Sequence, residues 1–443
     1  GQLRASAMEA ATKRQRVLHP TLTPATEATL LALGGAEAAA SLSRAAAAAG
    51  ANDWPEALCQ AQASSQACWA ALHTGHWAGV DPAWRTAYMV AAYYVALAGS
   101  QVGGSEEGET VRLRAALRAL DLGLMLGGTS FRRQLLFLAE MIEAILEETR
   151  EAPAAAEPPP GASHAPAEPC MTLRALSGSA VARLRLPPLI YFYNEFMVTA
   201  RPAVLQGAMQ TWPAMSSRPW ADLSYLKRVA GHRTVPVERG SSYLASDFDE
   251  QLMSLEQFIE THIERRGEGA AEAAASGPTA YLAQHRLFEQ VPRLREDIQL
   301  PDYCALSTSE EEEQTEEEVA INAWLGPRGT ASPLHFDRVH NLLAQVVGSK
   351  YVRLYAPSHS ERLYPHPDGP HMNSSQIVDP EDYDHARFPR FAGTPYVDLV
   401  LGAGEMLYIP PRWWHFVESR ETSFSVSFWW GREYAFGPEE IPP

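Results

Sequence analysis

The stretch that decides the fold of this chain is "SPLHFDRVHN", Ser332 to Asn341. Successive side chains along a β-strand point to opposite faces, so His335 and Asp337 share one face while Leu334 and Phe336 share the other. The apolar pair suits a core, and the polar pair presents an imidazole and a carboxylate side by side. Taken alone, such a triplet is also compatible with a hydrogen-bonded pair at the end of a surface strand. The rest of the chain decides between these interpretations.

Strand-sized runs surround this triplet, rich in Val, Ile, Tyr, Phe and Trp and separated by Pro and Gly turns. They are "LIYFYNEF" (189–196), "AINAWLG" (320–326), "NLLAQVVG" (341–348), "KYVRLYAP" (350–357), "EMLYIP" (405–410), "HFVES" (415–419) and "SFSVSFWW" (423–430). Short strands at this spacing predict a β-sandwich or barrel. In the last run, serines alternate with Phe and Val, which predicts one small polar face and one packed face.

The N-terminal part has a different pattern. From about residue 25 to residue 148 it is rich in Ala and Leu with helical periodicity, as in "RLRAALRALDLGLMLGG" (112–128) and "FRRQLLFLAEMIEAILEE" (131–148). Gly, Asn and Pro clusters interrupt the pattern, so we expect several antiparallel helices. Large aromatic residues are expected in their core, although helical hairpins also serve as docking surfaces for other proteins. These aromatic residues are Trp54, Trp69, Trp77, Trp84, Tyr88, Tyr93 and Tyr94.

Composition limits the class of partner. The 443 residues carry a net charge of −17, which argues against a protein that grips nucleic-acid phosphates and favours a basic, Lys/Arg-rich partner. The acidic run "SEEEEQTEEE" (309–318) would add to this attraction. Four cysteines without CxxC spacing indicate a reducing compartment, and we expect neither a membrane span nor a secretory signal.

A metal that performs redox chemistry on dioxygen is held by two imidazoles and one carboxylate on one face of an octahedron. His335 and Asp337 supply two of these ligands, and His415 in "YIPPRWWHFVE" (408–418) is the candidate for the third. The competing pair His366 and Asp368 lies in "YPHPDGPH" (364–371), where Pro and Gly mark a loop. We therefore reject this pair as a metal site.

Lys350 is the second candidate functional group. Alternation in "KYVRLY" (350–355) places it on the same face as Val352 and Leu354, which is expected to look inward. A buried ammonium group without an anion loses its proton or destabilises the fold, so an anionic ligand inside the barrel would explain it. Alternatively, Lys350 lies at a strand end and reaches water.

With these features in place, the chain resembles the Jumonji-C family of Fe(II)- and 2-oxoglutarate-dependent oxygenases. The resemblance extends from about residue 185 to the C-terminus and rests on "YLAQHRLFEQVP" (281–292), "PDYC" (301–304), "INAWLGPRGTASPLH" (321–335), "GSKYVRLYAP" (348–357), "YIPPRWWH" (408–415) and "SFSVSFWW" (423–430). It implies an α+β protein, in which an all-α N-terminal region precedes a double-stranded β-helix, the jelly-roll or cupin-like barrel, with flanking helices. Three segments follow: a helical interaction domain (1–150), a Pro/Ala-rich linker (151–169) and a catalytic region (170–443) with a core at about 281–436.

The resemblance also implies the ligands and their residues. Fe(II), 2-oxoglutarate and O2 are the expected cofactor and cosubstrates. Iron would be held by His335, Asp337 and His415, 2-oxoglutarate by Lys350, Tyr281, Asn341 and Ser332, and a substrate arginine would lie near Glu238 and Trp324. The middle residue Phe336 and the loops near Gly267 and Glu310 depart from the family pattern, which leaves the ligands intact and alters the substrate rim.

The function expected on this basis is C3-hydroxylation of arginine in basic proteins, with roles in chromatin and transcription regulation and in the cell cycle. HxD is similar to the peptidyl-hydroxylase branch, and zinc or histone-reader modules are missing from the sequence. Methyl-lysine demethylation of histone tails is the alternative, and a chromatin-associated interaction protein with a secondary oxygenase domain is an alternative of another class. A cupin-type lyase or a zinc-bound structural barrel would not need an inward lysine. We expect a monomer in the nucleus and also the cytoplasm, without direct nucleic-acid or membrane binding.

Overall fold

The computed structural model describes residues 19–76, 79–103, 105–149, 176, 178, 180–240, 244, 248–264, 279–308, 319–369 and 371–431. The chain divides into two compact units, one made of the helices up to residue 149 together with His232–Thr234, the other of the strands and helices from residue 180 onward. The linker expected at 151–169 and the acidic run 309–318 lie outside the described residues. Within the described ranges, no helix combines the length and apolar character needed to cross a membrane.

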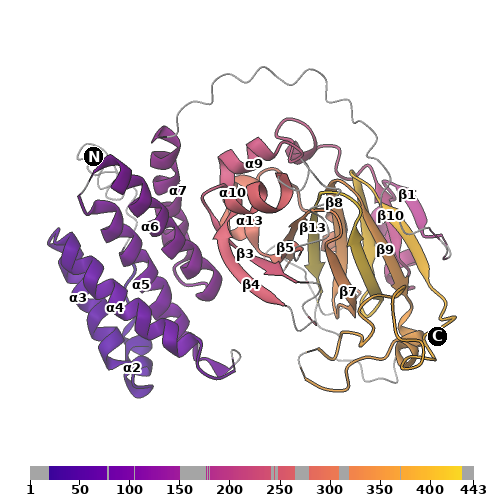
Figure 1. Cartoon of the computed structure of the whole chain (residues 1–443), viewed down its shortest axis with the longest axis horizontal. Helices are drawn as coiled ribbons and strands as arrows, with labels where there is room; N and C mark the ends of the chain where they lie inside the picture. Colours follow the sequence, from indigo (N-terminus) through magenta and orange to yellow (C-terminus); the bar gives the residue numbers. More distant parts are fainter. Residues whose placement is uncertain are drawn as a thin grey trace. The chain divides into compact units, whose positions relative to one another are not determined.

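The first unit is helical, as the Ala/Leu periodicity predicts, and its helices lie side by side in Figure 1. They are α2 (Pro24–Ala32), α3 (Ala36–Gly50), α4 (Trp54–Leu72), α5 (Pro82–Gln101), α6 (Glu106–Leu126) and α7 (Arg132–Thr149). Four begin at side chains that accept a backbone N–H, namely Thr23, Asp53, Asp81 and Ser105, and α2, α4 and α5 also have proline in the first turn.

Helix α5 is the centre of this unit. Tyr88, Tyr93 and Tyr94 are buried on it, as expected for core aromatics. Trp54 and Trp84 are partly buried against the same core, whereas Trp69 is 39% exposed. Trp77 lies outside the described residues. The tyrosines are covered because α5 has neighbours on several sides, whereas Trp69 of α4 is partly exposed and stacks on His73 at a ring distance of 4.1 Å.

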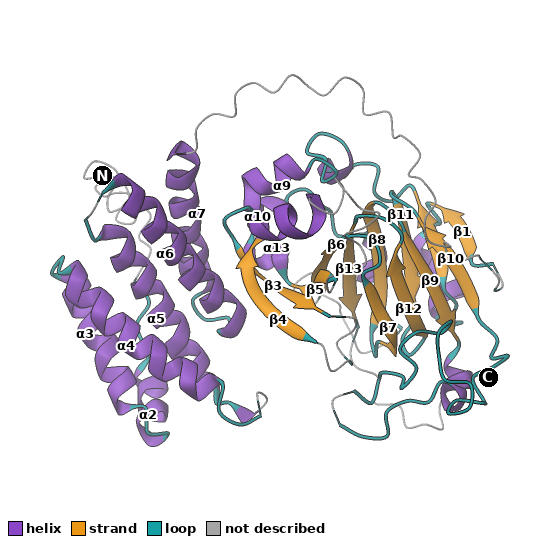
Figure 2. Cartoon of the chain, in the orientation of Figure 1, coloured by secondary structure: helices purple, strands orange, loops and turns teal. Residues whose placement is uncertain are grey.

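The second unit is built on strands, coloured orange in Figure 2. They are β1 (Ala182–Arg185), β2 (Ala203–Gln206), β3 (Thr234–Arg239), β4 (Asp249–Ser254), β5 (Ala280–His285), β6 (Ala320–Gly326), β7 (Ala331–Phe336), β8 (His340–Val347), β9 (Lys350–Tyr355), β10 (Val397–Leu401), β11 (Glu405–Ile409), β12 (Trp414–Ser419) and β13 (Ser423–Trp430). Short helices flank them, including α9 (Leu223–Ala230), α10 (Leu255–Phe258), α13 (Leu287–Gln290) and α14 (Pro292–Arg295).

The strands form two sheets. One has nine strands in the order β1-β2-β11-β8-β13-β6-β5-β3-β4, and the other has four in the order β10-β9-β12-β7. The described pairs are antiparallel except β1 with β2. Consecutive strands β8 and β9 belong to different sheets, and the chain turns between them at Gly348 (φ 72°). This confirms the α+β class with a cupin-like barrel, and β1 to β4 join its larger sheet although they precede residue 281.

Side chains along the strands point alternately into the lumen of the barrel and into the hydrophobic cores outside it. On β13, Phe424, Val426 and Phe428 belong to the large core outside the barrel, and the intervening serines are buried on the lumen face. On β9, Val352 and Leu354 pack in the lumen core. Lys350 is therefore on the inward face, as the sequence predicts.

One predicted strand is wrong. The run 189–196 forms helix α8 (Leu189–Phe192) and a π-helical turn, η2 (Tyr193–Met197). A short apolar run does not distinguish a strand from a buried helix, and Pro188 at the N-cap favours the helix. Helical spacing lets Phe192 and Phe196 point to one side, where the Phe192 ring lies 5.0 Å from that of Tyr408.

Candidate metal centre

His335, Asp337 and His415 converge at one end of the small sheet. His335 lies on β7, Asp337 directly follows that strand, and His415 on neighbouring β12 is in register with His335. One ligand atom from each residue lies within 4.8 Å of the others. His415 Nε2 and Asp337 Oδ2 are 3.7 Å apart. Two imidazoles and one carboxylate at this spacing fit a divalent iron ion and leave coordination positions for other ligands.

Backbone carbonyl groups orient both imidazoles. Nδ1 of His335 lies 2.7 Å from the Pro333 carbonyl oxygen, and Nδ1 of His415 lies 2.9 Å from that of Trp413. Each Nδ1 therefore carries the proton, and each Nε2 lone pair is directed at the site. Burial, and then the nearby His335, lowers the pKa of His415 to about 4. His415 is thus neutral at physiological pH, as a metal ligand must be.

Lys350 lies deep in the same lumen and is 2% exposed. Its Nζ donates a hydrogen bond of 2.8 Å to the Tyr281 hydroxyl, and burial lowers the pKa of Lys350 to about 7. The side chain does not reach water, which removes the alternative of a lysine at an open strand end. No carboxylate within the described residues pairs with it, so the lumen offers a site for an external anion.

His335, Asp337, His415 and Lys350 line one narrow cavity of about 30 Å3. The other lining residues predicted from the sequence are Tyr281, Trp324, Ser332 and Asn341. Ser427 belongs to the small polar face predicted for 423–430, and four residues not predicted from the sequence complete the wall: Leu343, Ile409, Val417 and Trp429. Trp429 continues the alternation of the β13 serines, and this signal could have placed it in the lumen.

Two polar atoms in this cavity are buried without a partner. They are Asn341 Oδ1 and Trp429 Nε1, whereas Asn341 Nδ2 donates to Asp337 Oδ2 at 3.1 Å. Buried polar atoms in folded proteins have partners as a rule. The open donor Trp429 Nε1 suits a carboxylate or keto oxygen, which only accepts hydrogen bonds, whereas the open acceptor Asn341 Oδ1 requires a hydrogen-bond donor.

Glu238 and Trp324, the two residues expected near a substrate, differ in their position relative to the cavity. Glu238 does not line the cavity but lies on β3 directly opposite Tyr281 of β5. Burial, and then the charge of Glu250, raises the pKa of Glu238 to about 7. Trp324 lines the cavity, and its Nε1 donates to Ser427 Oγ at 2.9 Å. Trp324 therefore has a structural partner, and Glu238 lies next to a residue of the cavity wall.

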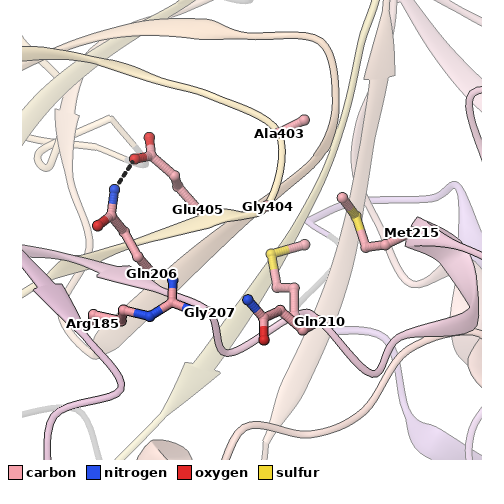
Figure 3. A pocket seen from close by; sticks show the side chains of 9 residues that line it. Arg185, Gln206, Gly207, Gln210, Met215, Ala403, Gly404 and Glu405 are labelled. Carbon is pink, nitrogen blue, oxygen red and sulfur yellow. Dashed lines mark hydrogen bonds between the residues drawn. The ribbon is translucent and has the colours of Figure 1, made fainter.

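A second, larger hollow of about 570 Å3 lies at the other end of β11 (Figure 3). It is lined by Arg185, Gln206, Gly207, Met209, Gln210, Met215, Ala403, Gly404 and Glu405. Its carboxylate is already engaged, because Glu405 accepts from Arg183 and Gln206. In the part of the chain that the structure describes, only the triad groups three metal-ligating side chains. The smaller cavity is thus the candidate functional site.

Comparison with known proteins agrees with this architecture. A family of cupin-like domains matches residues 189–436, and a family of KDM8-like N-terminal ARM repeats matches residues 22–157. The chain is 36% identical to lysine-specific demethylase 8 of Xenopus tropicalis, over 82% of this chain and 86% of the relative. It is 42% identical to Jumonji C domain-containing protein 5 of Drosophila melanogaster, over 58% and 61%.

A more distant relative is the human bifunctional peptidase and (3S)-lysyl hydroxylase JMJD7, which is 27% identical over 66% of this chain and 92% of the relative. The cupin-like match covers more than half of the chain and includes the triad and the cavity wall. The resemblance drawn from the motifs is confirmed. The chain belongs to the cupin-like Jumonji-C family of 2-oxoglutarate-dependent oxygenases and carries an N-terminal region of KDM8-like ARM repeats.

Proposed function

We propose that this oxygenase hydroxylates C3 of an arginine side chain in basic proteins. The observation that carries the proposal is the half-buried carboxylate of Glu238, which lies outside the cavity lining but opposite the cavity residue Tyr281, with Glu250 nearby. A guanidinium group pairs with a carboxylate through two parallel hydrogen bonds. Such a pair would hold the arginine head group at the rim and leave its aliphatic carbons directed toward the metal ligands.

The roles of the cavity residues follow from their positions. His335, Asp337 and His415 would hold Fe(II), and Lys350 with Tyr281 would hold the distal carboxylate of 2-oxoglutarate. Together, iron and 2-oxoglutarate supply the oxidation of an unactivated C–H bond with O2, with succinate and CO2 as co-products. The narrow lumen limits water at the reaction site, and the rim fixes which carbon is presented.

Methyl-lysine demethylation is the second candidate, because the similar proteins from Xenopus and Drosophila include one named lysine-specific demethylase 8. The comparisons favour this candidate over arginine hydroxylation. The same oxidation on an N-methyl carbon gives a hydroxymethyl group that leaves as formaldehyde. The name of the human relative includes a lysyl hydroxylase, which supports stable hydroxylation as chemistry within reach of the family.

The partners and location form part of the proposal. A chain with a net charge of −17 favours basic proteins, including histone tails, as substrates. The helical unit would dock such partners, and a nuclear role in chromatin regulation would follow. These assignments rest on charge and on the names of relatives.

The test uses intact-mass spectrometry of two peptides, one with arginine and one with mono- or dimethyl-lysine, incubated with the full chain, Fe(II), 2-oxoglutarate and O2. We expect one added oxygen on the arginine peptide, with succinate formed in parallel and neither product with His335→Ala. Loss of methyl groups with release of formaldehyde, and an unchanged arginine peptide, would replace the proposal with demethylation. No change to either peptide, with no succinate, would favour an interaction protein instead.

A further inference from the structure

Two of the three metal ligands depend on a strand at the edge of its sheet. Strand β7 carries His335, is followed by Asp337, and is the last strand in the order β10-β9-β12-β7. It pairs with β12 on one side only. An edge strand has backbone N–H and C=O groups without strand partners and bends or frays more easily than a central strand. A metal site needs its ligands held within fractions of an ångström.

A short ribbon covers this edge. It consists of residues 364–366 and 373–376, which bond to each other through Gln376 N–H to the Tyr364 carbonyl and His366 N–H to the Ser374 carbonyl. On its other side the ribbon bonds to β7, where Ser375 N–H donates to the Leu334 carbonyl at 2.8 Å. The edge of the metal-binding strand is thus paired by a segment that lies far from it in the sequence.

Asn373 makes the contact closest to the ligands. Its carbonyl oxygen accepts the Phe336 N–H at 2.9 Å, and its Nδ2 donates to the Phe336 carbonyl oxygen at 3.0 Å. Phe336 is the residue between the two ligands His335 and Asp337, and both of its backbone groups are held by this one asparagine. Any residue at position 373 could accept the Phe336 N–H through its backbone carbonyl. The bond from Nδ2 to the Phe336 carbonyl requires the asparagine side chain.

The peptide group on the other side of Asp337 is held as well. The Asp337 carbonyl oxygen accepts the Arg412 N–H at 2.7 Å. Arg412 has a φ of 65°, a conformation that costs energy for a residue with a side chain and is typical of functional sites. The backbone before Asp337 is therefore fixed by the Asn373 side chain, and the backbone after it by the strained turn before His415.

We propose that Asn373 is a positioning residue for the metal centre, acting through the backbone of Phe336 on the direction of the Asp337 carboxylate and the His335 ring. The inference rests on the metal site of the proposed function but does not depend on which substrate is oxidised. Residues that orient metal ligands without touching the metal commonly change metal affinity about 10- to 100-fold when they are replaced. The sequence neighbours of Asn373 give no sign of this role, because the contact forms only when the ribbon reaches β7.

The test measures metal affinity, not turnover. The metal-free full chain is titrated with Co(II), whose visible absorption reports the ligand set, in the wild type and in Asn373→Ala and Asn373→Asp. The aspartate keeps the shape but cannot donate to the Phe336 carbonyl and repels it. We expect the dissociation constant for Co(II) to rise about tenfold or more in both variants, with a larger rise for aspartate and an altered spectrum.

Gln376→Ala is the matched control, because Gln376 lies in the same ribbon but its side chain bonds only away from β7. Its Nε2 donates to the Pro365 carbonyl at 3.3 Å and its Oε1 accepts from Arg387 at 3.3 Å. We expect Co(II) affinity within twofold of the wild type for this variant. Equal affinities for all three variants and the wild type would overturn the role of Asn373, and so would equal losses in Asn373→Ala and Gln376→Ala.

The result separates this inference from the proposed function. If Co(II) binds and weakens as expected while neither peptide is oxidised, the positioning role stands and the choice of substrate fails. If Co(II) binding is the same with and without His335, the metal site itself is absent and both fail.

Discussion

Lys350 is a buried amine, and its hydrogen bond to the neutral Tyr281 hydroxyl does not compensate for a positive charge. Burial lowers its pKa to about 7, so about nine in ten of these amines are neutral at pH 8. A bound dicarboxylate favours the charged form and raises this pKa. We therefore expect uptake of close to one proton with 2-oxoglutarate at pH 8 and about a tenth of a proton at pH 6.

Isothermal titration calorimetry in buffers of different ionisation enthalpy measures this uptake. Because only the charged amine pairs with the carboxylate, 2-oxoglutarate affinity should also fall about tenfold per pH unit above pH 7. Lys350→Met should weaken 2-oxoglutarate binding and remove the proton uptake. Uptake that is absent at pH 8 in the wild type, or unchanged in the variant, would contradict the role of Lys350.

Glu238 predicts a second pH dependence: affinity for an arginine peptide should rise with pH, whereas affinity for 2-oxoglutarate falls. Burial and the charge of Glu250 raise its pKa to about 7, so it is mainly protonated at pH 6 and mainly ionised at pH 8. A guanidinium binds only the ionised form, so KM for an arginine peptide should fall several-fold between pH 6 and pH 8. At saturating 2-oxoglutarate, Glu238→Gln should give a high and nearly flat KM. A flat wild-type profile would remove Glu238 from the substrate site.

Single residues also show what the sequence can and cannot predict. Side-chain alternation places His335 beside Asp337 and directs Lys350 inward, and the structure brings these side chains to one cavity. Metal and cosubstrate binding by these residues stays a prediction. Asn373 could not be identified from the sequence, because its contact with Phe336 spans 37 residues and depends on the path of a ribbon without strong periodicity.

At the level of elements, the change of sheet between β8 and β9 depends on one glycine. Gly348 has a φ of 72°, and a Cβ there would overlap the Thr422 carbonyl oxygen, which is backbone and cannot rotate away. Gly348→Ala should lower the free energy of unfolding by about 3 kcal/mol, combining backbone strain and overpacking. Gly393→Ala is the control, because its φ is 71° but no atom lies within 4 Å of the added Cβ.

Urea unfolding followed by tryptophan fluorescence compares the two variants. The control should lose about 1 kcal/mol, from backbone strain alone. Equal losses would show that crowding at the Thr422 carbonyl contributes nothing. Gly348 would then not be required for the turn between β8 and β9.

Strand β13 follows from the sequence because Phe and Val alternate with serine, so that one face is apolar and the other is not. The run 189–196 is apolar on nearly all sides, so its period is ambiguous and helix α8 is missed. The order of the strands in the sheets could not be predicted from the sequence either. The neighbours of β11 are β2, about two hundred residues earlier, and β8, about sixty residues earlier, and nothing local selects them.

At the scale of the whole molecule, the net charge of −17 sets the preference for substrates. Attraction between an acidic protein and a basic peptide is screened by salt, with a Debye length of about 30 Å at 0.01 M and 10 Å at 0.1 M. KM for a peptide with several Lys or Arg residues should rise several-fold over this range. A peptide with a single arginine and no other charge should change less, and equal salt dependence would argue against long-range attraction.

The acidic run 309–318 provides a sharper version of this test. Changing Glu310, Glu311, Glu312 and Glu313 to Gln should reduce the salt dependence for the basic peptide and leave 2-oxoglutarate affinity unchanged. A salt dependence identical to the wild type would show that these charges do not act on the substrate.

The central claim is that the metal triad and Lys350 serve oxidation of C3 of an arginine side chain. An arginine peptide carrying two deuterium atoms at C3 tests it most directly, with the product examined by fragment mass spectrometry. The account predicts a product that has lost one deuterium and gained one oxygen at C3, in amounts equal to the succinate formed beyond that made without peptide. A product that keeps both deuterium atoms, or oxidation confined to a methyl-lysine peptide, would contradict it.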